Sequence, residues 1–213
     1  MKYILGIDEA GRGPVVGPMV IAGVLLEKAS ERKLKRLGVR DSKMLSPARR
    51  RELRKKILDE AVEFHCISIS PHRIDSRKVS LNELEAQVIA ELLKKFRHRI
   101  DHIYIDLPDP SAESFINRIK KYIDVKSKIT AEHKADLKYP VVGAASIIAK
   151  TERDKRIKEY EKKYGKIGSG YPSDPRTIKF LKKNINLPII RKSWSTTQRL
   201  KEKGRQRKIE DWF

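Results

Sequence analysis

Acidic residues stand at the ends of two strand-like apolar segments and just before a predicted helix. Asp8 and Glu9 end the first segment, Asp106 ends the second, and Asp136 precedes the helix that begins at Pro140. Capping alone could explain one such acid near a helix N-terminus. Four carboxylates that converge at the edge of a sheet would repel one another, and a hard divalent cation relieves that repulsion. The pattern therefore predicts a metal site.

The cysteine and histidine content indicates which metal such a site would bind. The chain has one cysteine, Cys66, and five scattered histidines. A single cysteine excludes an internal disulfide framework and a cysteine-based structural zinc site. Ligation by oxygen alone favours Mg²⁺ or Mn²⁺ over zinc. Two such ions, about 3.5–4 Å apart, would generate the attacking hydroxide and stabilise the leaving oxygen.

The neighbouring acids Asp8 and Glu9 raise a geometric question, because adjacent residues of a strand point to opposite faces. They can share a site only if the strand ends there and the chain bends into the Gly11–Gly13 turn. Alternatively, Glu9 contributes its backbone carbonyl as a ligand. We expect Asp8 to bridge the metal ions and leave the part of Glu9 open.

The whole chain is strongly basic. Its 213 residues include 49 Lys and Arg against 28 Asp and Glu, a net charge of +21. This excess indicates a polyanionic partner, with nucleic acid the first candidate, a membrane surface the second, and a merely solvated basic surface the alternative. A basic protein with an acidic metal pocket is what a nuclease requires, because the cations hold the phosphate backbone while the carboxylates hold the metal. No Ser-His-Asp arrangement offers a protein nucleophile instead.

Short apolar runs that read as strands alternate with segments that read as helices, which indicates an α/β domain. The predicted strands cover residues 2–8, 19–26, 62–69, 102–106 and 125–130. Helices are predicted over 30–36, from Ser46-Pro47, after the capping pattern of Ser80 and Glu83, over 111–122, and from Pro140 to a stop at Gly165. The longest apolar run, 14–26, is shorter than the roughly 18 residues that a membrane span needs. We expect a cytoplasmic protein without membrane contact.

Five motifs occur in the order of one known family. They are Gly6-Ile7-Asp8-Glu9-Ala10-Gly11-Arg12-Gly13, Asp41-Ser42-Lys43, Ile105-Asp106, His133-Lys134-Ala135-Asp136 and Gly168-Ser169-Gly170-Tyr171-Pro172-Ser173-Asp174. In these residues the sequence resembles ribonuclease HII, the type 2 ribonuclease H, in its archaeal form. The resemblance implies a ribonuclease-H-like mixed sheet flanked by helices, with a small C-terminal helical extension.

The resemblance also implies an activity, the endonucleolytic cleavage of RNA in RNA–DNA hybrids and at single ribonucleotides within duplex DNA. The products would carry 3′-hydroxyl and 5′-phosphate ends, and Asp8, Glu9, Asp106 and Asp136 match the family's catalytic carboxylates. One rival hypothesis is another nuclease of the same superfamily, such as a junction resolvase. The other is a non-catalytic nucleic-acid-binding protein, which would explain the charge but not the acids at the ends of separate elements.

Substrate recognition is implied at further positions. Gly11, Arg12 and Gly13 match the motif that reads the ribose 2′-hydroxyl, and Tyr171 matches the tyrosine at the ribonucleotide–deoxyribonucleotide junction. A glycine-flanked turn lets backbone groups approach a sugar, whose 2′-hydroxyl both donates and accepts. The alternatives are a turn without a ligand, an Arg12 that pairs with a phosphate, and a half-buried loop aromatic at Tyr171. Lys43 is expected either to bind a phosphate near the scissile bond or to be solvated.

The C-terminal region has a different composition. Segment 182–208 holds ten Lys and Arg and one acid, and we expect it to be a helical appendage. Gln206, Ile209, Trp212 and Phe213 have the spacing of the PIP box, the peptide by which replication and repair enzymes bind the sliding clamp PCNA. Residues three and four positions apart share a helix face, which can enter an apolar groove. The alternative is that the two aromatic residues pack on the protein's own core.

These features together predict three parts of the chain. The first is a catalytic domain over 1–181, the second a basic helical extension over 182–205, and the third a clamp-binding tail over 206–213. We expect a monomer that uses Mg²⁺ or Mn²⁺ and acts on RNA–DNA hybrids and ribonucleotide-containing DNA.

Overall fold

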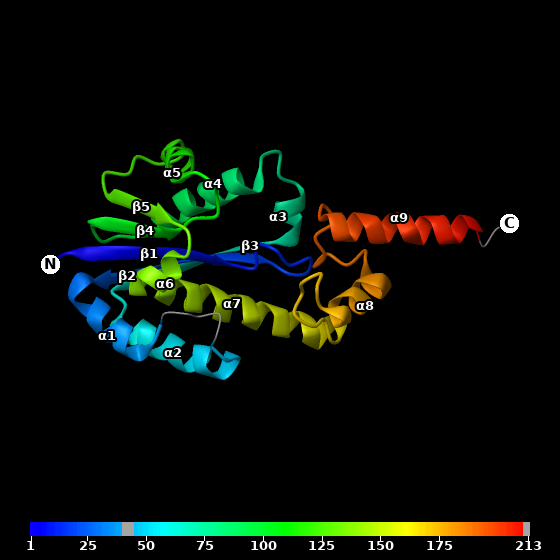
Figure 1. The fold of residues 1–213 in the computed structure, drawn as a ribbon, viewed down its shortest axis with the longest axis horizontal. Helices are drawn as coiled ribbons and strands as arrows, with labels where there is room; N and C mark the ends of the chain where they lie inside the picture. The colour runs from blue at the N-terminus through cyan, green and yellow to red at the C-terminus, as the bar shows by residue number, and fades with distance from the viewer. Residues whose placement is uncertain (40–44, 211–213) are drawn as a thin grey trace. The chain divides into compact units, whose positions relative to one another are not determined.

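The sheet that carries the predicted acids is seen in the computed structural model, which describes residues 1–39 and 45–210, with side chains as far as residue 203. Its five strands lie in the order β3-β2-β1-β4-β5 (Figure 1). The strands are β1 (Tyr3–Ala10), β2 (Met19–Glu27), β3 (Glu63–Ile69), β4 (His102–Asp106) and β5 (Lys128–Glu132). β1 is antiparallel to β2 and parallel to β4, and β4 is parallel to β5. The sheet is therefore mixed, which confirms the expected fold class.

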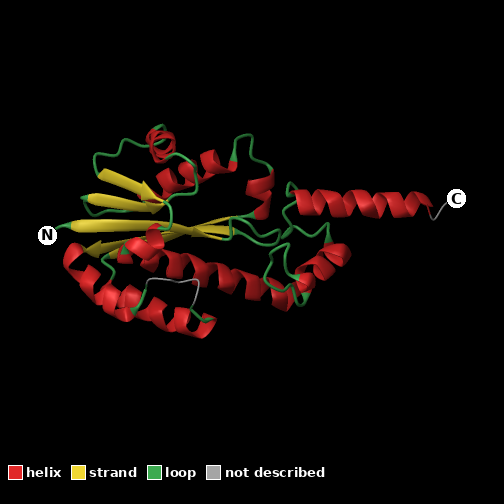
Figure 2. Ribbon diagram, viewed as in Figure 1, coloured by secondary structure: helices red, strands yellow, loops and turns green. Residues whose placement is uncertain are grey.

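Helices connect and flank the strands (Figure 2). They are η1 (Lys28–Ser30), α1 (Glu31–Leu37), α2 (Pro47–Glu60), α3 (Pro71–Asp75), α4 (Leu81–Leu93), α5 (Ala112–Lys120), α6 (Ala135–Lys138), α7 (Pro140–Tyr164), α8 (Pro175–Asn184) and α9 (Ser195–Glu210). Ser46, Ser70, Ser80 and Ser111 each accept a hydrogen bond from the N–H three residues further on. Such caps satisfy backbone donors that a helix start leaves unpaired. The predicted helix starts at Ser46 and Ser80 are confirmed.

The first compact unit comprises residues 1–10, 20–68 and 78–152. Helices α1, α2 and α7 cover one face of its sheet, and α4 and α5 cover the other (Figure 2). Apolar side chains of β2 and the first half of α7 form much of the core. Gly6 of β1 allows α7 to pack closely, because a Cβ at this position would overlap the carbonyl group of Val141. The close packing holds α7 against the strand that carries Asp8 and Glu9.

The second compact unit comprises residues 11–19, 69–77 and 153–213. Its buried core consists of Val15, Val16, Ile167, Phe180, Leu181, Ile189 and Ile190. Val16 and Ile190 pair in an isolated antiparallel bridge. This bridge fastens the segment after β1 to the segment before α9, although the two are far apart in the sequence.

The structure differs from the predicted elements at several places. The strand predicted over 125–130 lies at Lys128–Glu132, and the helices α3, α6 and α8 were not predicted. Helices of five and four residues are too short for a helical period to be recognised. No helix in the described residues is long and apolar enough to cross a membrane.

Candidate active site

Three carboxylates meet at the carboxyl ends of two parallel strands. Oxygen atoms of Asp8, Glu9 and Asp106 all lie within 4.8 Å of one another, and we call these residues the carboxylate cluster. The pairing of β1 with β4 ends at Ile7 and Ile105, and Asp106 is the last residue of β4. The acids therefore lie where the ladder between the two strands stops.

The strand does not end at Asp8, so that expectation was wrong. β1 continues to Ala10, with Asp8 opposite Ala22 and Glu9 opposite Ile21 of β2. The Asp8 carboxylate accepts a hydrogen bond from the Glu9 backbone N–H, with Oδ1 and N 2.7 Å apart. Its carboxylate is thereby turned along the strand toward the next residue. Neighbouring acids on opposite faces can share the site because the β4 ladder no longer covers this edge of β1.

Helix α7 supports Asp8 from one side. The Lys150 Nζ donates to Ser146 Oγ at 2.7 Å, and Ser146 hydrogen-bonds the Asp8 carboxylate. Burial raises the pKa of Asp8 well above its ordinary value, and the charges of Glu9 and Asp106 raise it further. The Ser146 hydrogen bond and the Lys150 charge oppose this shift without cancelling it. The folded chain thus resists a negative charge that a bound cation would compensate.

The fourth predicted acid, Asp136, lies next to a residue that contacts the cluster. The Ala135 N–H donates to Asp106 Oδ1 at 2.8 Å. Asp136 is 1% exposed, and its Oδ1 has no hydrogen-bond partner among the described residues. Leaving a buried acceptor unpaired is unfavourable, and a cation can satisfy it. The structure thus brings carboxylate oxygens of Asp8, Glu9 and Asp106 within 4.8 Å of one another. The hydrogen bond from Ala135, the residue before Asp136, fixes the backbone next to the fourth acid.

The donor set fits a hard divalent cation. Asp8, Glu9, Asp106 and Asp136 offer only carboxylate oxygen, the donor that Mg²⁺ and Mn²⁺ prefer. A cavity of about 10 Å³ adjoins the cluster, which is about the volume that one water-sized ligand needs. Its lining includes Ile7, Ile21, Glu85, Ile89, Ile105 and Pro108.

Glu85 of α4 is a cavity residue that sequence reasoning missed. Its side chain is 1% exposed and lines the cavity at the carboxylate cluster. It follows Leu81 by four residues, so it lies on the apolar stripe of the helix. An acid on such a stripe is unusual, because Glu is rarely buried. That position was the signal that could have identified it.

The glycine turn, residues 11–13, lies in the second unit. Gly11 has φ +86°, in the left-handed region that favours glycine. A Cβ at Gly11 would overlap the side chain of Arg153, which is only 7% exposed. Backbone conformation and close packing therefore both require glycine at this position.

Arg191 is a second residue that sequence reasoning missed. In the sequence it was only one of the ten Lys and Arg residues of segment 182–208, whereas in the structure its side chain is completely buried. Its guanidinium donates to the carbonyls of Gly11, Arg12 and Gly17 at 2.6, 2.8 and 3.0 Å. Its place in a Lys- and Arg-rich segment gave no local signal of this role.

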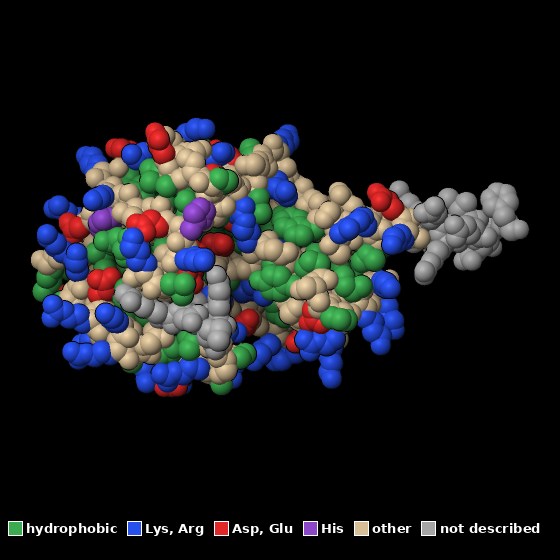
Figure 3. Space-filling model, viewed as in Figure 1, with side chains coloured by type: hydrophobic (Ala, Val, Ile, Leu, Met, Phe, Trp, Pro, Cys, Tyr) green, Lys and Arg blue, Asp and Glu red, His purple; other side chains and the backbone are tan. Residues whose placement is uncertain are grey.

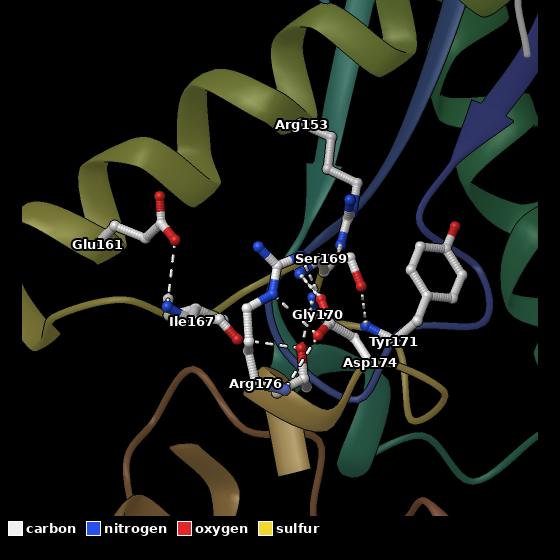
Figure 4. A network of polar contacts seen from close by, with 9 residues as sticks. Arg153, Glu161, Ile167, Ser169, Gly170, Tyr171, Asp174 and Arg176 are labelled. Atoms are coloured by element: carbon white, nitrogen blue, oxygen red, sulfur yellow. Dashed lines mark hydrogen bonds and ion pairs between the residues drawn. The ribbon is translucent and has the colours of Figure 1, made fainter. Parts of the chain in front are cut away.

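Tyr171 lies in a loop held by polar contacts (Figure 4). The Ser169 N–H donates to Asp174 Oδ2 at 2.8 Å, within the network that fixes the loop. The Tyr171 ring is 41% exposed and points away from this network (Figure 4). The guanidinium carbon of Arg153 lies 5.7 Å from the ring centroid. A ring presented in this way can stack on a base or a sugar.

The remaining predicted residues are only partly covered. Lys43, Trp212 and Phe213 lie outside the described residues. Gln206 and Ile209 belong to α9, beyond the last described side chain.

Comparison with known proteins gives one consistent result. The family model described as Ribonuclease HII matches residues 5–197. The ribonuclease HII of Pyrococcus furiosus is 44% identical over 208 residues, which cover 95% of this chain and 93% of that protein. The crystal structure of ribonuclease H2 from Pyrococcus horikoshii OT3 has a TM-score of 0.88 and 40% identity, and the match covers 95% of this chain and 99% of that one. The PCNA:RNase HII complex from Archaeoglobus fulgidus has a TM-score of 0.83 and 39% identity, with coverage of 91% and 95%.

Proposed function

The chain belongs to the ribonuclease HII family, and we propose that it cleaves at single ribonucleotides embedded in duplex DNA as well as in RNA–DNA hybrids. Family membership makes it a metal-dependent endonuclease that hydrolyses the RNA of such hybrids. Cleavage at single ribonucleotides embedded in duplex DNA is the part that we propose. Its products would be a 3′-hydroxyl end and a 5′-phosphate end.

The carboxylate cluster is the observation that carries the proposal. Three acids with oxygens within 4.8 Å of one another stand out in a chain with a net charge of +21. Lys and Arg side chains are spread over the face seen in Figure 3, where they can attract a phosphate backbone. A general nucleic-acid-binding surface would gain nothing from a cluster of acids that repels a phosphate.

We assign Asp8, Glu9, Asp106 and Asp136 to holding two Mg²⁺ or Mn²⁺ ions when substrate is bound. Such ions supply Lewis-acid stabilisation of the charge that develops at the scissile phosphate. The Glu9 N–H orients Asp8, and the Ala135 N–H orients Asp106. Carboxylates held in this way keep their oxygens in place without reorganisation during the reaction.

The glycine turn is the proposed reader of the ribose 2′-hydroxyl. Gly11 follows Glu9 by two residues, so their Cα atoms are at most about 7 Å apart. Chain connectivity alone therefore keeps the turn close to the acidic end of β1.

Tyr171 is proposed to contact the nucleotide at the junction between ribonucleotide and deoxyribonucleotide. A Cβ at Gly13 would be 3.5 Å from Tyr171 Cε1, so the exposed ring lies beside the turn. Lys43 is proposed to bind a phosphate near the scissile bond. We further assign duplex binding to the exposed cations of the extension over 182–205.

A duplex with one ribonucleotide tests the proposal. Cleavage only at that nucleotide, and only with Mg²⁺ or Mn²⁺ present, is the expected result. The controls are the all-DNA duplex of the same sequence and the Asp8→Asn variant. Cleavage of the all-DNA duplex would instead indicate another nuclease of the superfamily, and binding without cleavage would indicate a non-catalytic protein.

A sliding clamp is the proposed protein partner. Gln206, Ile209, Trp212 and Phe213 have the PIP-box spacing, and the Archaeoglobus fulgidus relative forms a complex with PCNA. We propose that the tail over 206–213 binds the clamp through Ile209 and the two aromatic residues.

A further inference from the structure

All three carbonyl groups of the glycine turn accept hydrogen bonds from one short segment. Arg191 donates Nη2 to Gly11 at 2.6 Å and Nη1 to Arg12 at 2.8 Å. Trp194 donates Nε1 to the Gly13 carbonyl at 3.2 Å. Residues about 180 positions away in the sequence therefore hold every carbonyl of the turn.

Arg191 is part of the buried interior beside the turn. Its side chain is fully buried, and its Nε donates to the Gly17 carbonyl at 3.0 Å. A buried charge is costly unless it is hydrogen-bonded, and here carbonyl dipoles provide the partners. The guanidinium carbon also lies 4.9 Å from the centroid of the Trp194 ring, which helps to fix its plane.

The direction of these carbonyls sets the direction of the N–H groups on the other side of the turn. None of the described peptide bonds is cis, and a trans peptide unit points its N–H opposite to its C=O. The Gly11 carbonyl shares a peptide unit with the Arg12 N–H, and the Arg12 carbonyl shares one with the Gly13 N–H. The N–H groups of Arg12 and Gly13 consequently point away from Arg191.

We infer that Arg191 is a positioning residue for ribonucleotide recognition, holding the Gly11 and Arg12 carbonyls so that the turn presents the N–H groups of Arg12 and Gly13 to the ribose. The inference rests on the proposed reading of the 2′-hydroxyl by this turn. Arg191 acts through the backbone and does not touch the substrate. Its guanidinium is occupied within the fold, so it adds nothing to the binding of phosphates.

The shape of the guanidinium explains why arginine is required at this position. Its planar fork carries five N–H donors in fixed directions and contacts the Gly11, Arg12 and Gly17 carbonyls together. A lysine keeps the charge but donates from a single nitrogen atom. Arg191→Lys therefore separates a role of the fork from a role of the charge.

The test compares Arg191→Gln, Arg191→Lys and Trp194→Phe with the control Leu181→Ala. Leu181 is fully buried in the same core and so tests general loosening of the second unit. Single-turnover kcat/KM is measured on a duplex with one ribonucleotide, at a temperature where circular dichroism shows all variants folded. Affinity for the all-DNA duplex is measured in parallel.

Both Arg191 variants should lower kcat/KM by about 10–100-fold, because small displacements of a positioned substrate are costly. Affinity for the all-DNA duplex should stay within about twofold of wild type, since no phosphate-binding side chain is altered. Trp194→Phe keeps the ring and removes one donor, so it should show a smaller loss of the same kind. Leu181→Ala should retain wild-type kcat/KM despite a lower Tm.

Wild-type kcat/KM in Arg191→Lys would overturn the inference, because the charge alone would then suffice. A loss in Leu181→Ala equal to that of the Arg191 variants would reduce Arg191 to a stability role and also overturn it. If the wild-type protein does not cleave at an embedded ribonucleotide, the proposed function fails and the inference falls with it. If it does cleave and the Arg191 variants match it, only the inference fails.

Discussion

The backbone N–H of Glu9 donates to Asp8 Oδ1 over 2.7 Å, so one acid of the cluster is oriented by the peptide of the next. This bond directs the Asp8 carboxylate toward the end of β1, where Asp106 also lies. Asp8 is thereby placed among like charges in a buried position. The same geometry that suits it to bind a cation makes it unfavourable for the metal-free fold.

Replacing Asp8 with Asn should abolish cleavage and stabilise the metal-free protein. Activity should fall by about 1,000-fold or more, since the cation is worth several kcal/mol of charge stabilisation in the transition state. The Tm without metal should rise by about 2–4 °C for each kcal/mol of repulsion that is relieved. Cleavage assays in Mg²⁺ and calorimetry in a chelator measure the two effects. Activity near wild type would remove Asp8 from the mechanism.

Asp8 also predicts the pH dependence of the metal-free protein. Burial is the main cause that raises the folded-state pKa of Asp8, and the charges of Glu9 and Asp106 raise it further. Above the ordinary pKa of 3.8, the folded state therefore retains a proton that the unfolded state has lost. Stability from this group should therefore fall as pH rises from 3.8 toward the folded-state pKa, and then stay level. Asp8→Asn should remove this fall, and saturating Mg²⁺ should reduce it in the wild type. Urea unfolding between about pH 4 and pH 8 provides the measurement, and parallel curves for the two proteins would contradict the prediction.

Replacing Tyr171 with Ala should reduce cleavage at an embedded ribonucleotide more than it reduces binding. The exposed ring lies beside the glycine turn and contacts Arg153, so its removal should disturb position more than affinity. We expect a loss of about tenfold or more in single-turnover rate with a smaller change in Kd. Tyr171→Phe, which retains the ring, is the matched control. Equal losses in rate and in Kd would make Tyr171 a general part of the binding surface.

Exposed and buried cations of segment 182–208 should differ in their effect on salt dependence. Neutralising the exposed residues Lys182, Lys183, Lys192 and Arg199 to Gln should flatten the plot of log K against log salt, by up to about 0.9 for each phosphate that is no longer neutralised. Arg191→Gln should leave this slope unchanged. Deleting the segment is a poorer test, because it also removes core residues such as Ile190. An unchanged slope in the fourfold variant would assign the segment a structural role.

Changing both Trp212 and Phe213 to Ala should abolish binding to the sliding clamp. The tail carries no catalytic group, so cleavage of a short duplex without clamp should stay near wild type. Calorimetry with the whole protein and with a peptide spanning Arg205 to Phe213 measures the interaction. If the double variant instead loses Tm and clamp-free activity, the two aromatic residues pack on the protein itself.

Local patterns in the sequence were sufficient for most of the secondary structure. Short apolar runs rich in branched residues located the strands, helical spacing located α4, and serine caps located the starts of α2 and α4. The acids at the strand ends could be expected to converge at the edge of a sheet, whereas the parallel pairing of β1 with β4 that brings them together is seen only in the structure. These signals are readable because each depends on residues close together in the chain.

What the sequence determined by itself was therefore the order of the elements, the acidic ends of the strands and the family to which the motifs point. Tertiary structure alone decided that Arg191 lies beneath the turn, that Glu85 lines the cavity, and that Asp8 and Glu9 meet along one open edge. Whether a charged side chain faces solvent or a distant carbonyl depends on the packing of segments far apart in the chain. No local pattern records that packing, because burial and long-range hydrogen bonds arise only when the whole chain has folded.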